Sequence, residues 1–220
     1  MADFAWLLNR GYAHPSSLKL VGDHYRLTAR QRLAVRRSAC TDEARAARRA
    51  RQTSLAAQRG GAIGIDGYNL LITVESALSG GLVLIGRDGC YRDLASVHGT
   101  YRKVSETTAA LHLIMDHLDA ATVGHVDWYL DRPVSNSGQL KTLIAELLEK
   151  RDEGTPRATT WNIELMDSPD AVLASYPAAV ATSDSAVLDS CGPWLNLARE
   201  IIEARIPQAW CLDLRAGRTV

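Results

Sequence analysis

A ten-residue stretch from Ala62 to Leu71 constrains the fold more than any other part of this chain. It runs through small and aliphatic residues into Asp66, turns at Gly67, and continues in a second apolar run that begins at Leu70. A short apolar run with glycines on both sides predicts a buried strand, which here ends at Asp66. An acid in this position lies where parallel α/β sheets bind ligands, although such an acid also serves as a turn former or helix cap.

After residue 61 the chain alternates between strand-like and helix-like segments. Further strand candidates cover residues 82–85, 123–130, 161–166, 178–182 and 209–214. Helix candidates cover residues 70–78, 106–119, 138–150 and a segment that begins at Pro193. This alternation predicts a mostly parallel central sheet with helices on its faces. We therefore expect a three-layer, Rossmann-like α/β domain over residues 61–220.

Residues 1–60 have a different character, which predicts a basic helical N-terminal extension. Thr28 and Gln31 have the spacing of a capping box, and Thr41 precedes two acids, so a helix is expected to begin after each threonine. Residues 18–21 are apolar and fit either a strand or a loop. The glycine pair at residues 60–61 marks the end of the extension.

Arginines are concentrated in this extension. The whole chain has 25 basic and 25 acidic residues, but ten arginines lie between residues 26 and 59 against only two acids. Arg45, Arg48 and Arg49 cluster on the second of the expected helices. Such a cluster is either a solvated helix face or the electrostatic footprint of nucleic-acid binding. On the second interpretation, these three arginines contact the phosphate backbone.

Acids end three of the expected strands, at Asp66, Asp131 and Asp184. Because parallel strands place their carboxyl ends at one edge of a sheet, these side chains are expected to converge. Clustered carboxylates need a compensating cation, and ligand sets made only of oxygen select Mg²⁺ or Mn²⁺. Such an ion can activate water and neutralise the charge of a phosphate transition state. The three acids therefore predict a catalytic metal site for phosphodiester hydrolysis.

Several other classes of protein lack support in the sequence. The four cysteines are scattered without a CxxC pair, which favours reduced thiols in a cytoplasmic protein over a zinc knuckle or a disulfide framework. No apolar run approaches the length of a membrane span, so no membrane partner is expected. Ser-His-Asp patterns, a P-loop and a convincing GxGxxG are missing. Tyr68 stands where a haloacid-dehalogenase-type phosphatase usually has a second acid.

Three segments resemble the PIN-like nuclease superfamily, including its NYN-type members: Ile65-Asp66-Gly67-Tyr68-Asn69-Leu70-Leu71, Leu130-Asp131-Arg132-Pro133-Val134-Ser135-Asn136-Ser137-Gly138 and Thr182-Ser183-Asp184-Ser185-Ala186. Two N-terminal segments resemble the domain of unknown function 434 family, which is placed among PIN-like proteins: Leu7-Leu8-Asn9-Arg10-Gly11-Tyr12 and Leu20-Val21-Gly22-Asp23. The superfamily resemblance implies a PIN-type fold and an acidic Mg²⁺ or Mn²⁺ site that cuts RNA or DNA. It also implies that Asp66, Asp131 and Asp184 bind the metal and that Asn69 positions the first of them.

PIN nucleases commonly use a fourth acid, and this chain offers several candidates for it. Glu75, Asp88 and Asp189 all qualify by position, and we take Asp88 as the additional metal ligand. Three further residues are expected to position the substrate: Asn69, Ser183 and Arg92.

We therefore expect a metal-dependent nuclease, with RNA preferred over DNA as the substrate and with a homodimer left open as its assembly. The alternatives are a catalytically inactive PIN-like protein that binds nucleic acid or serves in assembly, and a small-molecule phosphohydrolase. Geometry distinguishes these classes. Acid oxygens that can share one ion favour the enzyme, whereas acids that each cap their own helix favour the binding protein.

Overall fold

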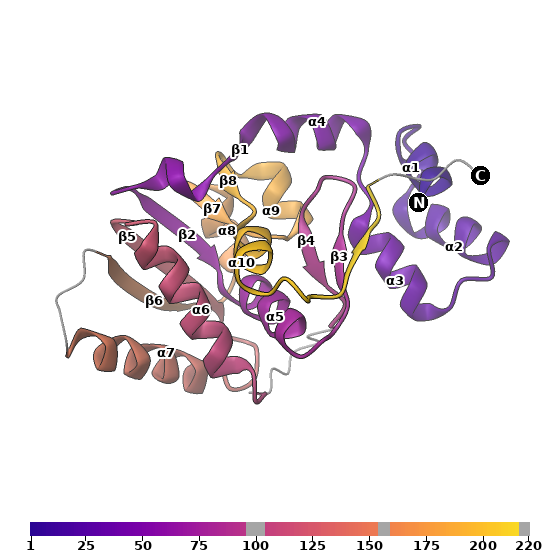
Figure 1. Cartoon of the computed structure of the whole chain (residues 1–220). Helices are drawn as coiled ribbons and strands as arrows, with labels where there is room; N and C mark the ends of the chain where they lie inside the picture. The colour runs from indigo at the N-terminus through magenta and orange to yellow at the C-terminus, as the bar shows by residue number, and fades with distance from the viewer. Residues whose placement is uncertain (96–103, 154–158, 216–220) are drawn as a thin grey trace.

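The computed structural model describes residues 1–95, 104–153 and 159–215 of the chain. Within these residues, six strands form a fully parallel main sheet in the order β1-β8-β7-β2-β5-β6 (Figure 1). Their bounds are β1 (Gln52–Thr53), β2 (Ala62–Asp66), β5 (His125–Asp131), β6 (Thr160–Met166), β7 (Ala179–Ala181) and β8 (Trp194–Leu195). The expected α/β architecture with a parallel central sheet is confirmed.

Helices cover both faces of this sheet and complete a three-layer arrangement. One face packs against α5 (Gly67–Leu78), α6 (Thr107–Ala120), α7 (Ser137–Asp152) and α10 (Leu197–Arg205). The other face packs against α8 (Pro169–Ala174) and α9 (Ser185–Ser190). Side chains alternate between the faces of a strand, so Trp128 of β5 belongs to the first core and its neighbour Tyr129 to the second.

Two of the expected strands lie in a separate, smaller sheet. In the described residues this sheet has the order β4-β3-β9, with β3 (Val83–Ile85) antiparallel to β4 (Tyr91–Asp93) and parallel to β9 (Cys211–Asp213). The segments at 82–85 and 209–214 were expected to belong to the central sheet. They are strands, but they pair with each other because the turn after β3 forms a hairpin and the C-terminal chain returns beside it.

The N-terminal residues form four helices: α1 (Ala2–Leu8), α2 (His14–His24), α3 (Ala29–Ser38) and α4 (Asp42–Arg51). The capping box of Thr28 and Gln31 is present at the start of α3, and the Thr41 hydroxyl accepts a hydrogen bond from the Ala44 amide at the start of α4. Both expected helix starts are confirmed. Residues 18–21, expected as a strand or loop, lie inside α2, whose first turn accommodates Pro15.

Residues 1–60 also contribute one strand to the central sheet. After α4, β1 pairs with β8, and the short 3₁₀ helix η1 (Leu55–Gln58) leads into β2. Trp194 and Leu195, expected in the first turn of a helix begun by Pro193, form β8 instead, and α10 starts at Leu197. Among the helices of the described residues, none is both long and apolar enough to cross a bilayer.

Candidate active site

The site lies where the connections of the central sheet change direction. After β2 the chain crosses toward β5 on one side, and after β7 it crosses toward β8 on the other. In open α/β sheets, ligands bind outside the carboxyl ends of the strands at this topological switch point. Here the carboxyl ends of β2 and β7 bring Asp66 next to the loop of Thr182, Ser183 and Asp184.

Two glycines make this junction possible. A side chain at Gly67 would place its Cβ 2.2 Å from Trp128 Nε1 and 2.5 Å from the Tyr129 carbonyl oxygen, so only glycine lets α5 begin directly after Asp66. On β2, a Cβ at Gly64 would lie 3.1 Å from the ring of Tyr176, at the end of the segment that carries α8. The helix α8 lies against β2, and the charge of Asp170 in its first turn acts on Asp66 at the end of that strand.

Asp66 is a buried carboxylate with two donors on the same oxygen. Its Oδ2 accepts hydrogen bonds from Asn69 Nδ2 at 2.6 Å and from Thr182 Oγ1 at 2.7 Å, and the residue is 3% exposed. Burial, with smaller contributions from the charges of Asp184 and Asp170, raises the pKa of Asp66 to about 7 in spite of these two donors. Asp66 is therefore coupled to two other acids.

The other expected acids also reach this region. The Asp184 carboxylate accepts hydrogen bonds from the amides of Ala186 (2.7 Å) and Val187 (3.1 Å) and thus caps α9. Asp131 ends β5, and burial raises its pKa. Neither Asp66 nor Asp131 caps a helix in this way, because α5 has no side-chain cap hydrogen bond and α7 is preceded by Asn136.

Asp170, in the first turn of α8, is a fourth acid that the sequence patterns did not single out. Burial raises its pKa, and the charges of Asp184 and Asp131 raise it further. Asp66, Asp170 and Asp184 therefore influence one another at the switch point, and the charge of Asp131 acts on Asp170.

The donor chemistry of these residues suits a hard divalent cation, but they do not form a closed cage. Across residues 1–95, 104–153 and 159–215, no group of three or more His, Cys, Asp or Glu side chains is arranged to hold a metal ion. Mg²⁺ is usually held by one or two carboxylates, with water and substrate phosphates completing its shell. A cation at this site would therefore need oxygens from water or a substrate to complete its shell.

The remaining candidates for the fourth acid are engaged elsewhere. Asp88, expected as a metal ligand, is buried with both oxygens bound to the guanidinium of Arg92, and Arg48 binds one of them as well. Thr107 donates a hydrogen bond to Glu75, and Asp189 pairs with Arg48. In this structure the two arginines, not a metal site, compensate the charge of Asp88.

The three residues expected to position the substrate differ in whether they can reach it. Asn69 lies at the site, since its amide nitrogen contacts Asp66 and its oxygen accepts a 3.4 Å hydrogen bond from Ser183 Oγ. Arg92 is buried and reaches the site through the Ser183 carbonyl oxygen, to which its Nε donates at 2.8 Å. Its guanidinium has no free face for a substrate because Asp88 occupies the other two nitrogens.

The three arginines of the α4 cluster differ in their exposure to solvent. Arg45 and Arg49 are exposed, whereas Arg48 is 2% exposed and bonds to Asp88, Asp189 and the Ser185 carbonyl oxygen. The expectation that Arg48 contacts phosphate is corrected here, because the face of α4 that carries it packs against α9. Only Arg45 and Arg49 remain available to solvent.

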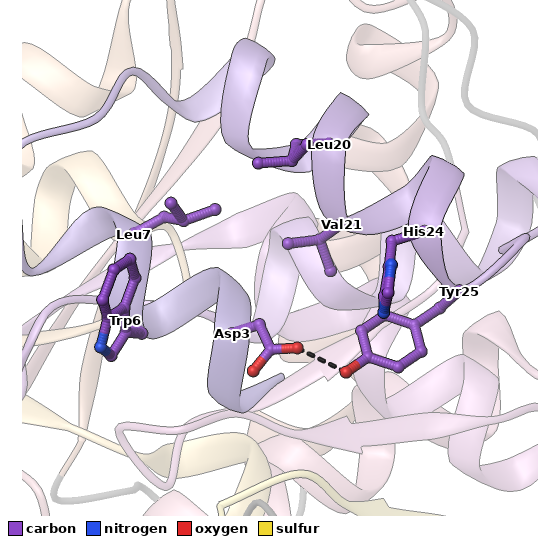
Figure 2. Close-up of a pocket in the computed structure, with 7 residues that line it drawn as sticks. All are labelled: Asp3, Trp6, Leu7, Leu20, Val21, His24 and Tyr25. Atoms are coloured by element: carbon purple, nitrogen blue, oxygen red, sulfur yellow. Dashed lines mark hydrogen bonds between the residues drawn. The ribbon is translucent and has the colours of Figure 1, made fainter.

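The N-terminal helices contain a groove of their own, apart from the acids. A cavity of about 420 Å³ lies between α1 and α2 and is lined by Asp3, Trp6, Leu7, Leu20, Val21, His24 and Tyr25. Figure 2 shows these side chains and the hydrogen bond that the Tyr25 hydroxyl donates to Asp3. The lining includes none of the expected site residues, so this groove is separate from the carboxylate site.

Comparison with known families gives the chain its classification. The family model described as "Domain of unknown function (DUF5616)" matches residues 55–200, which is more than half of the chain. The chain belongs to the DUF5616 family. The DUF5616 segment runs from η1 into α10 and contains all four acids of the switch point.

A second family model, described as "Protein of unknown function (DUF434)", matches residues 1–51. It covers the four N-terminal helices and confirms the resemblance expected for that region. A relative of this DUF5616 chain is the uncharacterized protein MJ0935 of Methanocaldococcus jannaschii. It is 33% identical over 147 residues, which cover 67% of this chain and 70% of the relative. No solved structure matches the chain.

Proposed function

We propose that this DUF5616 chain is a PIN-like nuclease that hydrolyses phosphodiester bonds of RNA, or of DNA, with the help of Mg²⁺ or Mn²⁺. The observation that carries the proposal is the link from Asp66 through the Thr182 hydroxyl to the Asp184 amide at the switch point of a parallel sheet, where the charge of Asp170 also acts on Asp66. Repulsion between the buried Asp66 and the nearby acids makes the site attractive to a cation. The parallel sheet and the strand-end acids support the PIN-like assignment, which rests on the resemblance of their motifs.

The protein groups hold the carboxylates in place before any ligand binds. Asn69 and Thr182 donate to the same oxygen of Asp66, so that carboxylate has a fixed orientation. The Thr182 hydroxyl in turn accepts a hydrogen bond from the Asp184 amide at 3.0 Å. One hydroxyl therefore sets the distance between the loop that carries Asp184 and the end of β2.

A bound Mg²⁺ or Mn²⁺ would supply an activated water and compensation for the negative charge of the transition state. Asp66 is the residue whose ionisation such a cation would favour most, because burial otherwise holds its proton up to about pH 7. Asp184 is held in a different way, because the amides of Ala186 and Val187 in α9 donate to its carboxylate.

The N-terminal helices would attract a nucleic-acid backbone. Residues 1–51 contain eleven Lys and Arg residues against four Asp and Glu residues, a net charge of +7 in a chain that is neutral overall. Arg45 and Arg49 are the exposed members of the α4 cluster and are the proposed phosphate contacts. The N-terminal helices would therefore attract a polyanion, whereas the four acids lie in the DUF5616 segment.

One observation favours the second candidate, a catalytically inactive protein that binds nucleic acid. Asp184 caps α9, which is the role expected of the acids in such a protein. The side chains of Asp66 and Asp131 do not cap helices, and the charge of Asp131 acts on Asp170, a further acid of this region. The balance of the four acids therefore supports the enzyme.

A cleavage assay tests the proposal directly. Single-stranded RNA and DNA would be incubated with the wild-type chain in Mg²⁺, in Mn²⁺ or in EDTA, and then with Asp66→Asn. Asp167→Asn is the matched control, because Asp167 follows β6 on the surface and pairs only loosely with Arg132 (3.5 Å). Cleavage that needs the metal and is lost only in Asp66→Asn supports the nuclease, whereas cleavage that survives EDTA or Asp66→Asn rejects it.

A further inference from the structure

Two buried arginines from distant parts of the chain meet at one buried carboxylate. Arg48 lies on α4, Arg92 lies on β4, and their side chains are 2% and 3% exposed. Arg92 Nη1 and Nη2 donate to the two oxygens of Asp88 at 2.8 and 2.7 Å, and Arg48 Nη1 donates to Oδ2 at 2.5 Å. Charges this deeply buried are stable only when fully paired, so the three side chains fix one another.

Each arginine also donates to the backbone of the loop that carries Asp184. Arg92 Nε donates to the Ser183 carbonyl oxygen at 2.8 Å, and Arg48 Nη2 donates to the Ser185 carbonyl oxygen at 3.1 Å. These carbonyl groups stand on either side of Asp184 in the chain. The two guanidinium groups therefore hold the backbone on both sides of this acid.

The surroundings of the network are adapted to it. A Cβ at Gly86 would lie 2.4 Å from Arg92 Nη1 and 2.9 Å from Asp88 Oδ1, so glycine leaves room for the paired groups. Burial pushes the pKa of Asp88 upward, but the charges and hydrogen bonds of Arg92 and Arg48 outweigh this effect and hold the pKa below its usual range. The network therefore stays charged at neutral pH.

We propose that Arg48 and Arg92 are positioning residues for the carboxylate site. Bridged by Asp88, they fix the segment from Ser183 to Ser185 and thereby hold Asp184 beside Asp66. The importance of that placement for catalysis rests on the proposed function. Arg48 belongs to the DUF434 segment and Arg92 to the DUF5616 segment, so the N-terminal helices contribute to the framework of the site as well as to the basic surface.

The test compares Arg92→Lys with Asp189→Asn. Lysine keeps the positive charge beside Asp88 but has a single nitrogen, which cannot pair with both carboxylate oxygens and also reach the Ser183 carbonyl. Asp189→Asn weakens only the outer, half-exposed end of the network, where Arg48 Nε donates at 2.7 Å. If Arg92→Lys does not fold, Arg48→Lys removes the contact with the Ser185 carbonyl and takes its place.

Amide hydrogen exchange of the full-length chain without added metal is the first readout. We expect the amides of Asp184, Ala186 and Val187 to exchange about tenfold faster in Arg92→Lys, while those of the central strands β2 and β5 and all amides in Asp189→Asn keep their rates. Unchanged exchange in this loop, or equal acceleration throughout the sheet, overturns the proposal.

Cleavage kinetics are the second readout and separate this inference from the proposed function. We expect Arg92→Lys to lower kcat with KM unchanged, because Arg92 acts on the placement of Asp184 and not on substrate binding. A raised KM with unchanged kcat contradicts the positioning role. If the wild-type chain does not cleave, the proposed nuclease fails, and hydrogen exchange still decides whether the arginines hold the loop.

Discussion

The hydroxyl of Thr182 donates a 2.7 Å hydrogen bond to Asp66 and ties the carboxyl end of β7 to that of β2. Its oxygen also accepts a hydrogen bond from the Asp184 amide, so one side chain links two acids of the site. The link spans the switch point of the sheet, which is the position where this fold class binds ligands. Thr182 therefore contributes both to the stability of the fold and to the geometry of the site.

Replacing Thr182 with valine keeps the shape of the side chain and removes both hydrogen bonds. Because Thr182 is buried and two polar groups lose a partner, the free energy of unfolding should fall by roughly 1–3 kcal/mol. Urea denaturation measures this change. Thr142→Val is the control, since the exposed Thr142 hydroxyl donates to the Gly138 carbonyl of its own helix, and its effect should stay within about 0.5 kcal/mol. Equal losses in both variants would contradict the role of Thr182.

Asp66 should make stability depend on pH. Burial raises its pKa in the folded chain to about 7 from an ordinary value of 3.8, so unfolding releases a proton between these pH values. Its contribution to stability is fully present below the ordinary value and is lost as the pH rises through about 7. Chemical denaturation from pH 4 to pH 8 in EDTA should show a steeper decline for wild type than for Asp66→Asn. Parallel curves for the two proteins would exclude the raised pKa.

The two glycines at helix starts should respond in opposite directions to substitution by alanine. Gly67→Ala brings a methyl group against Trp128 and the Tyr129 carbonyl, so it should destabilise the fold by about 1–3 kcal/mol or more. Gly138, in the first turn of α7, has open space where a Cβ would lie, with no neighbouring atom within 4 Å, and Gly138→Ala should stabilise the fold by about 0.4–1 kcal/mol. Thermal denaturation distinguishes them, and a Gly67→Ala variant as stable as wild type would refute the close junction.

Asp170 should matter for activity although it does not end a strand. If it belongs to the carboxylate site, Asp170→Asn should lower metal-dependent cleavage about 10–100-fold, as is typical for residues that support a metal site. The exposed Asp167 stands three residues earlier, and Asp167→Asn should leave the rate unchanged. Equal rates for Asp170→Asn and wild type would remove Asp170 from the site.

Arg45 and Arg49 should contribute to nucleic-acid affinity through phosphate contacts. For single-stranded RNA, Arg45→Ala/Arg49→Ala should reduce the slope of log affinity against log salt concentration by about 1.4. Fluorescence anisotropy in EDTA, which prevents cleavage, measures this slope. Lys141→Ala/Lys150→Ala removes the same charge from the exposed face of α7 and should leave the slope unchanged. Equal slopes in the two double variants would place the RNA elsewhere.

The features that the sequence predicted well are those with local signals. The apolar run before Asp66 and the capping box of Thr28 depend only on neighbouring residues, and both are present in the structure. Trp194 and Leu195 were placed in a helix because Pro193 suits a helix start. Their strand conformation depends on pairing with Gln52–Thr53 and with β7, which is a contact between distant parts of the chain that no local pattern reports.

The same limit explains the residues that were misplaced or missed in the site. Asp170 follows a proline in the first turn of a helix, where an acid is also explained by the helix dipole, and only the crossover from β6 to β7 brings it near Asp184. Arg48 is identical in type to its exposed neighbours. The spacing of Ala44, Arg48 and Arg51 on one helical face was the available signal that these residues point inward.

Binding of Mn²⁺ measured by electron paramagnetic resonance tests the central claim most directly, because it asks whether the carboxylates share a cation. The titration would use wild type, Asp66→Asn and the control Asp167→Asn, each with and without adenosine 5′-monophosphate as a phosphate that can complete the shell. We predict that wild type and Asp167→Asn bind Mn²⁺. We predict that the affinity of Asp66→Asn for Mn²⁺ is lower by about tenfold or more. Absence of binding to wild type in both conditions, or equal affinity in Asp66→Asn, would contradict the account.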